Sequence, residues 1–278
     1  MKIITLPDEL NLDNSQSVQV FDYHSSKEIS KQQIVLNQNT FSFLTEGTKE
    51  VVFDNSALSI DNSKFLVMKS GHCLMTEKLS NIKNYRSVLL FFTSETLLKF
   101  TQKIELSKLK EVEQKSVYSF DYDDFIQRFV NSLLDVYQLS KDTQKKLLEV
   151  KFEEIMLYLT EVKGTEFLYS LTENSDNATQ KFIRTIENNQ FSKLTLKELA
   201  FLCGMSISTF KREFEKYYSE SPIKWFQNKR LEYAHYLLNK EQKSSSEIYF
   251  EIGYENLSSF IQAYKSKYGI TPKQHNKK

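Results

Sequence analysis

Hydrophobic and polar residues alternate over short stretches through residues 1–115, and no long helical period occurs before the end of that region. Runs rich in β-branched and aromatic residues, separated by Asn, Asp, Gly and Ser, are typical of strands joined by turns. We expect strands at 18–23, 33–37, 40–47, 49–54, 57–61, 64–71 and 87–93. Turn signals between these runs predict successive hairpins at Gly47, Asp54-Asn55, Asp61-Asn62 and Gly71. The region therefore predicts a small antiparallel barrel or sandwich.

The apolar period becomes helical after residue 120, and residues 121–138 and 142–162 predict two amphipathic helices. In the second helix four apolar residues recur at spacings of four, three and four: Leu148, Phe152, Ile155 and Leu159. This seam suits packing against another helix, or against the barrel of the same chain. The polar stretch at 170–178 predicts a linker.

The last third of the chain contains one helical pattern twice, about 50 residues apart. The first copy carries Leu199, Cys203, Gly204, Phe210, Phe214, Tyr218 and Pro222, and the second carries Ile248, Ile252, Gly253, Phe260, Tyr264, Tyr268 and Pro272. Each copy predicts a short helix, a glycine turn and a second helix with a polar outer face. This arrangement is a helix-turn-helix geometry, and the duplication predicts two places of contact with a polymer.

Local signals define the boundaries of these helices. Thr195 followed by Glu198 predicts a capping box at the first supporting helix, and Gly204 supplies the positive φ of the turn. Ser206 and Ser208 are candidate caps of the next helix. Between the copies, Pro222 begins a helix that runs to Leu238 and is roughly 25 Å long at 1.5 Å per residue.

The net charge of +1 conceals two halves of opposite sign. Residues 177–278 hold 17 Lys/Arg and 10 Asp/Glu, which is +7, and subtraction from the totals of 37 and 36 leaves 20 and 26, or −6, for residues 1–176. A basic segment joined to an acidic one indicates that only the C-terminal part contacts a polyanion.

Several classes of protein are disfavoured by composition. No apolar run is long enough for a membrane span, and the first residues do not resemble a signal peptide, so we expect a cytoplasmic protein without membrane contact. Cys73 and Cys203 are expected to be thiols. His24 and His72 do not form a metal set, and common nucleotide and hydrolase motifs are missing. We expect no cofactor, metal or catalytic residue, and hence no enzyme.

The stretch EIGYENLSSFIQAYKSKYGITP, together with LAFLCGMSISTFKREFEKYY and RLEYAHYLL, resembles the AraC/XylS family of bacterial transcription regulators. The resemblance covers residues 178–275. It implies seven helices and two helix-turn-helix units that contact two major-groove segments of one duplex. The N-terminal strand spacing resembles the cupin-like sensor domains found in that family, and the resemblance favours a dimer interface at Leu148, Phe152, Ile155 and Leu159.

Carried over by position, the resemblance implies two sets of DNA contacts. Bases would be contacted by Ser208, Lys211, Arg212, Ser258, Ser259 and Gln262, and phosphates by Thr209, Lys216, Lys229, Lys265 and Lys267. The chemistry agrees, because Arg pairs with guanine and Gln with adenine in the major groove, whereas Lys contacts to phosphate position the protein. Two residues depart from the family pattern. Ser219 replaces a frequent glycine. Phe250 stands where the family usually has alanine, and we expect the extra bulk of the phenylalanine to be absorbed by repacking.

We therefore expect an α+β chain: an N-terminal regulatory and dimerisation domain over residues 1–169, a linker at 170–178, and a DNA-binding domain over residues 179–278. The expected function is that of an activator that binds double-stranded promoter DNA, contacts RNA polymerase and forms a homodimer. Its input would be a small molecule in the barrel or a protein partner, and the sequence leaves both open. The alternative is a ligand-binding or catalytic β-domain that a DNA-binding module merely localises.

Overall fold

The computed structural model describes residues 2–13, 16–104, 115–172, 178–241 and 243–275. The chain divides into two compact units, Met1–Asn177 and Ala178–Lys278. Within the described residues, no helix combines the length and apolar character that crossing a membrane requires.

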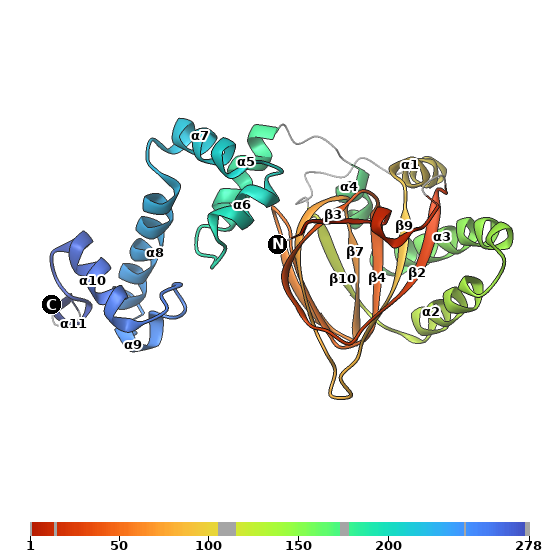
Figure 1. Cartoon of the computed structure of the whole chain (residues 1–278), viewed down its shortest axis with the longest axis horizontal. Helices are drawn as coiled ribbons and strands as arrows, with labels where there is room; N and C mark the ends of the chain where they lie inside the picture. The colour runs from red at the N-terminus through yellow and green to blue at the C-terminus, as the bar shows by residue number, and fades with distance from the viewer. Residues whose placement is uncertain (1, 14–15, 105–114, 173–177, 242, 276–278) are drawn as a thin grey trace. The chain divides into compact units, whose positions relative to one another are not determined.

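The N-terminal unit contains two five-stranded sheets (Figure 1). The first sheet has the order β1 (Ile4–Leu6), β3 (Ile29–Leu36), β8 (Gly71–Lys78), β5 (Thr48–Val52) and β6 (Ala57–Asp61). The second has the order β10 (Val117–Asp121), β7 (Lys64–Met68), β4 (Asn39–Glu46), β9 (Tyr85–Phe92) and β2 (Val18–Ser25). Every neighbouring pair is antiparallel except β1 and β3, which are parallel. A short 3-10 helix, η1 (Asp8–Leu10), follows β1.

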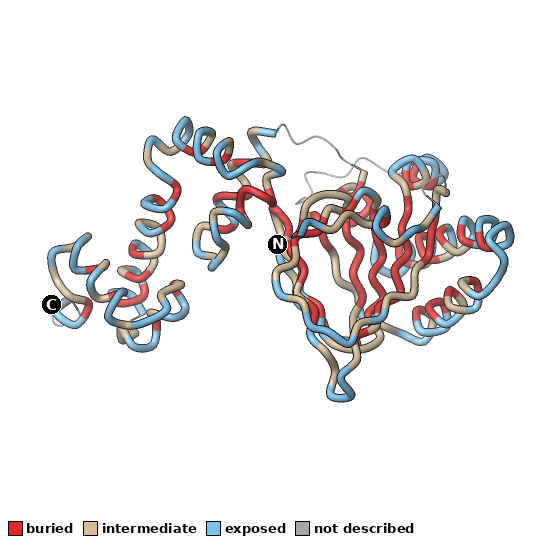
Figure 2. The backbone as a smooth tube through the Cα atoms, viewed as in Figure 1, coloured by how far each residue is buried: buried red, intermediate tan, exposed pale blue. Residues whose placement is uncertain are grey.

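Helices cover the outer face of the second sheet. They are α1 (Ser94–Lys103), α2 (Asp124–Tyr137), α3 (Lys141–Lys163) and α4 (Glu166–Thr172). One buried cluster joins Phe43 and Phe92 of the sheet to Phe129 of α2 and Phe152 of α3, with the rings of Phe92 and Phe152 4.9 Å apart. A second cluster, which includes Leu44, lies between the two sheets. The second sheet is thus buried on both faces (Figure 2).

These observations confirm the α+β class, the antiparallel N-terminal sheets and the two long helices. The expected succession of hairpins is wrong at three of its four turns. Asp54-Asn55 does join paired strands, β5 and β6. Gly47, Asp61-Asn62 and Gly71 instead carry the chain from one sheet to the other, because β4 and β7 belong to a different sheet from β5, β6 and β8. The hairpin expected at Gly71 implied a strand after it, and β8, with its mixed sequence GHCLMTEK, lies there but pairs in the other sheet. The short β1 and β10 and helices α1 and α4 were not predicted.

Two expectations about the end of this unit are corrected by burial. The seam of α3 is an interior surface, since Leu148, Phe152, Ile155 and Leu159 are all at most 1% exposed within the N-terminal core. They cannot bind a second chain without opening that core. The expected linker also begins too early, because Ser170 and Leu171 are buried in α4.

The C-terminal unit contains seven helices within its described residues: α5 (Ala178–Asn188), α6 (Leu196–Leu202), α7 (Ile207–Tyr218), α8 (Pro222–Asn239), α9 (Ser245–Ile248), α10 (Leu257–Tyr268) and α11 (Pro272–His275). They enclose two separate clusters. The first contains Phe210 and Phe214 of α7, and the second contains Phe260 and Tyr264 of α10. Helix α8 contributes to both, through Trp225 and Phe226 at one end and through Leu231, Ala234, Leu237 and Leu238 at the other.

The crossover between β4 and β5 depends on Gly47. Its φ is +91°, and a Cβ there would lie 2.5 Å from the carbonyl oxygen of Lys78 and 2.8 Å from the ring of Tyr85. Only glycine fits this approach of two sheets. Gly164, at the end of α3, also has a positive φ (+78°), but a Cβ on that residue would meet nothing within 4 Å.

We predict that Gly47→Ala lowers the free energy of unfolding of the N-terminal unit by about 2–5 kcal/mol, the sum of left-handed strain and overpacking. Gly164→Ala is the matched control and should cost only the strain, about 1–2 kcal/mol. Urea unfolding followed by circular dichroism and Trp225 fluorescence separates the two units, since the one tryptophan lies in the C-terminal unit. Equal losses for the two variants would show that the clash is relieved at no cost.

Candidate nucleic-acid interface

The first helix-turn-helix is built by local capping. Thr195 and Glu198 form a capping box on α6, and the Ser206 side chain accepts the backbone N–H of Thr209 at the start of α7. Gly204 has a φ of +69° in the turn. Phe210 and Phe214 are fully buried, and Tyr218 packs on the same cluster, whereas Tyr217 is exposed. These features agree with the sequence-based prediction.

The exposed face of α7 brings together Ser208, Lys211 and Arg212. The Arg212 side chain is 71% exposed, and its Nε lies 3.9 Å from a carboxylate oxygen of Glu213. Lys216 makes a closer pair with the same residue, at 2.7 Å. Exposed pairs of this kind are weak, so both cations are available to a polyanion. The Ser208 hydroxyl lies 2.9 Å from that of Ser206, and half-buried Thr209 belongs to the same cap.

The second unit presents a more polar helix. Asn256 caps α10 by accepting the backbone N–H of Ser259, and Gly269 ends it in the left-handed conformation. Ser258, Ser259, Gln262 and Lys265 are all exposed on this helix. Its supporting helix α9 has only four residues, and the chain continues through hydrogen-bonded turns to Gly253.

Lys267, one of the expected phosphate contacts, is engaged within the unit. Its Nζ donates to Glu232 Oε1 and to the carbonyl oxygen of Asn228, both at 3.0 Å. Burial alone would raise the pKa of Glu232, but hydrogen bonds and charge from Lys267 and Lys229 outweigh it and lower that pKa. The structure therefore places Lys267 as a tie between α10 and α8. Lys229 is also half-buried and paired with Glu232 at 3.5 Å.

The two departures from the family pattern behave differently. Ser219 ends α7 with a φ of +54°, the conformation that the usual glycine would adopt without strain. Phe250 is 64% exposed, so the expected internal repacking around it is wrong. Its ring instead receives the ammonium group of Lys193, 3.3 Å from the ring centre.

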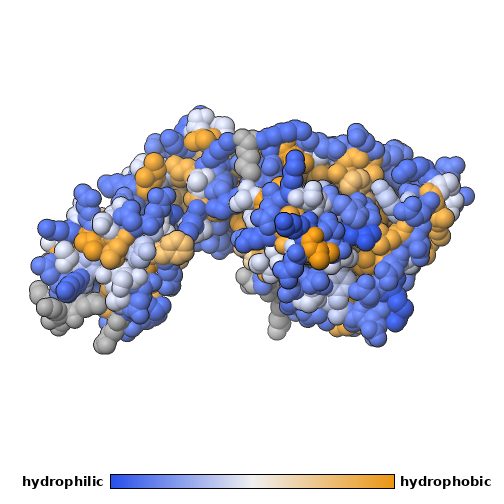
Figure 3. Space-filling view, turned by 60° about the horizontal axis from the view of Figure 1, so that its bottom comes forward, coloured by the Kyte–Doolittle hydropathy of each residue, from blue (hydrophilic) through white to orange (hydrophobic). Residues whose placement is uncertain are grey.

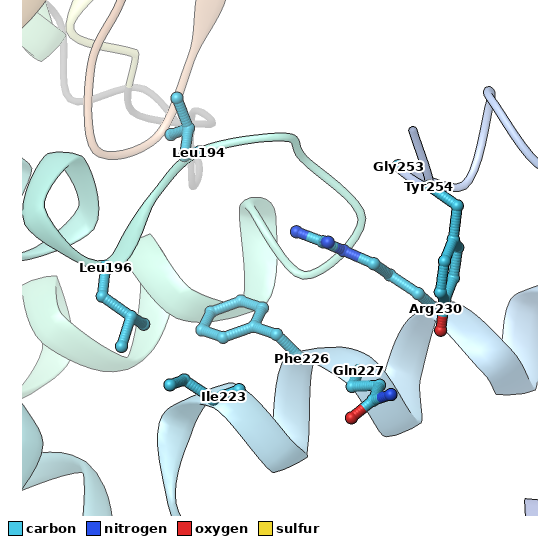
Figure 4. Close-up of a pocket in the computed structure, with 8 residues that line it drawn as sticks. All are labelled: Leu194, Leu196, Ile223, Phe226, Gln227, Arg230, Gly253 and Tyr254. Carbon is cyan, nitrogen blue, oxygen red and sulfur yellow. The ribbon is translucent and has the colours of Figure 1, made fainter. Parts of the chain in front are cut away.

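A cavity of about 380 Å³ lies beside α8 in this unit (Figure 4). Leu194, Leu196 and Phe226 line it from the first cluster, and Tyr254 of the second cluster lines it together with Gly253 in the turn beside it. The side chain of Arg230 crosses it, and partial burial lowers the pKa of that guanidinium. Arg230 could not be predicted as a site residue from the sequence, since a single basic residue on a helix carries no distinguishing pattern.

A second cavity, of about 280 Å³, lies in the N-terminal unit. Its lining is mainly aliphatic but includes Lys49 and Glu77, whose side chains are 2% and 5% exposed and 3.5 Å apart. Lys49 Nζ also donates to Ser42 Oγ at 3.0 Å. Alternation could have revealed this pair, because Lys49 shares a strand face with Val51, and Glu77 with Met75, both of which are buried.

Comparisons with known proteins agree with this architecture. The family described as the ExsA N-terminal regulatory domain matches residues 39–171, and the helix-turn-helix domain family matches residues 199–278. The second match contains both α7 and α10.

Three curated relatives span different shares of the chain. Thermoregulatory protein LcrF of Yersinia pestis is 29% identical over 58% of this chain and 59% of its own length. The virulence regulon transcriptional activator VirF of Yersinia enterocolitica is 28% identical over 66% of this chain and 68% of its own. The regulator ExsA of Pseudomonas aeruginosa is 25% identical over 82% of each.

Proposed function

We propose that this chain, which belongs to the AraC/XylS family of transcription regulators, activates transcription by binding one directional promoter site through α7 and α10. One observation carries the proposal: a single unit presents two capped helices whose buried faces match and whose exposed faces differ, with Lys211 and Arg212 on one and Gln262 on the other. Two unlike helices read two unlike half-sites.

The activity is binding rather than catalysis, and it takes place in the cytoplasm. Activation would follow from contact with RNA polymerase at the occupied promoter. Transcription with purified components measures this step, and a promoter that is bound without any gain in transcript would contradict activation.

We predict that Arg212→Ala weakens binding to the preferred site by about 1–3 kcal/mol and relaxes the choice of one base pair, because a bidentate contact to guanine is lost. Lys265→Ala should weaken all sequences alike and lower the salt dependence of binding by about one ion. The measurement is a titration of selected and scrambled duplexes at several salt concentrations.

Lys267→Ala is the control, since its ammonium group is held by Glu232 and Asn228. It should reduce the stability of the unit without changing the salt slope. An Arg212→Ala protein that keeps both wild-type affinity and wild-type base preference would contradict the base contact. Absence of binding to any duplex would contradict the proposed function itself.

We also propose that the chain acts as a homodimer, through the outer face of α3. That face carries Leu147, Val150 and Leu157, which are 38%, 62% and 54% exposed. Val150 and Leu157 lie opposite the buried seam, because helical geometry places them about half a turn away from Phe152 and Ile155, and Leu147 lies on the flank of that face. The face of the chain that Figure 3 shows is mainly hydrophilic, with scattered apolar patches.

Val150→Asp is predicted to shift the chain to the monomer, since it places a charge in an apolar interface. Leu98→Asp, at a similarly exposed apolar position on α1, is the matched control and should leave the dimer intact. Sedimentation across a range of protein concentrations measures both. A wild-type chain that remains monomeric would contradict the dimer, and an unaffected Val150→Asp dimer would exclude this face.

The input is proposed to be a small molecule in the cavity between the sheets. A buried ion pair usually contributes little to stability, yet Lys49 and Glu77 occupy this aliphatic cavity. Glu77 Oε2 is buried without a well-formed hydrogen bond, although the Tyr23 and Tyr85 hydroxyls lie close enough to Glu77 to interact with it. A compact apolar molecule with one hydrogen-bond donor would satisfy that oxygen.

We predict that Lys49→Met alone lowers the free energy of unfolding by about 3–5 kcal/mol, because it leaves a carboxylate buried without its partner. The double replacement Lys49→Met with Glu77→Leu should be neutral, or stabilising by about 1–4 kcal/mol. Urea unfolding tests the energies, and promoter activity across growth conditions tests the function. If the double variant still responds to conditions as the wild type does, the pair is not the receptor of the signal.

A further inference from the structure

The two helix-turn-helix cores of the C-terminal unit are joined by α8 and do not share a single cluster. Trp225 and Phe226 belong to the first core, and Leu231, Ala234, Leu237 and Leu238 to the second. Each core can therefore pivot on its own end of α8 unless other contacts prevent it. The relative placement of α7 and α10 depends on those contacts.

A loop between α5 and α6 supplies contacts of this kind. The loop starts from the first core, yet three consecutive residues reach the second half of the unit. The Phe191 ring lies 4.8 Å from that of Tyr233, which packs on the second core. The Ser192 carbonyl oxygen accepts a hydrogen bond from Arg230 at 2.8 Å. The Lys193 ammonium lies 3.3 Å from the ring centre of Phe250.

Arg230 extends this connection to the turn of the second unit. A Cβ on Gly253 would lie 3.3 Å from an Arg230 guanidinium nitrogen, so the turn packs directly against that group. Figure 4 shows the Arg230 side chain leaving α8 toward the loop that carries Leu194, with Tyr254 beside it. One guanidinium thus contacts the first core's loop and the second core's turn.

Phe250 and Phe191 have no evident role in either core. They are 64% and 41% exposed. An aromatic side chain on the surface gains little from burial, whereas a cation over its ring gives a directional contact. Their placement is explained by the connection they make between the two halves.

We propose that residues Phe191–Lys193, with Arg230 and Phe250, form a clamp that sets the separation and angle of α7 and α10, so that the chain accepts two half-sites at one spacing only. This inference rests on the proposed function. These are positioning residues, since they act on DNA through the two recognition helices.

The test uses the full-length chain and its preferred duplex, obtained by selection from random DNA. One base pair is inserted or removed between the half-sites, which moves one half-site by about 3.4 Å along the axis and about a tenth of a turn around it. The readout is the ratio of the dissociation constants for the altered and the preferred spacing. A lost phosphate contact weakens all duplexes alike and leaves this ratio unchanged.

We expect the dissociation constant of the wild type to rise by about tenfold or more when the spacing changes. In Lys193→Ala and Phe250→Ala the ratio should fall to about threefold or less, with weaker binding at the preferred spacing. Lys197→Ala removes an exposed lysine from α6 and is the matched control, with a wild-type ratio.

Arg230→Ala tests the contacts that the guanidinium makes with the Ser192 carbonyl oxygen and with the turn at Gly253. Should that variant fail to fold, the two exposed substitutions still decide the matter. Wild-type ratios in both Lys193→Ala and Phe250→Ala would overturn the clamp while leaving the proposed function standing. A wild-type chain that binds no DNA would overturn both, and a wild type indifferent to spacing would overturn the clamp alone.

Discussion

Helix α8 is the constraint on which the C-terminal unit depends, because neither helix-turn-helix core is complete without it. The first core needs Trp225 and Phe226 to cover the aromatic face of α7, and the second needs Leu231 and its neighbours to cover α10. Small helical cores bury too little apolar surface to be stable alone. Sharing one helix stabilises both cores and holds the two recognition helices within one compact unit.

In the N-terminal unit the corresponding constraint is the second sheet, which is buried on both faces. Strands β4 and β9 turn Phe43 and Phe92 toward the helices and Leu44 and Tyr85 toward the other sheet. A strand covered on both faces has no solvent side, and the second half of β9 accordingly reads as the continuous apolar run VLLFF, whereas β4 buries Thr40 and Ser42 among its apolar residues. The same burial leaves the Lys49–Glu77 pair away from water and gives the cavity its mixed lining.

Much of the C-terminal unit could be predicted from the sequence, because its signals are local. The capping box at Thr195, the left-handed turn at Gly204 and the proline that begins α8 each act within a few residues. The N-terminal topology could not be predicted in this way. A turn at Gly47 looks the same whether the next strand pairs with the last or crosses to another sheet, and only the approach of Lys78 and Tyr85 distinguishes them.

Sequence alone was enough for the repeat, the two long helices of the N-terminal unit and the residues exposed on α7 and α10, since helical periods and caps are properties of neighbours in the chain. Only long-range packing decides which exposed-looking side chains are engaged within the fold. It turned the seam of α3 inward, paired Lys267 with Glu232, and placed Lys193 over Phe250. These contacts join residues far apart in the chain, so their geometry exists only once the N-terminal core, or the two C-terminal cores with α8, are assembled.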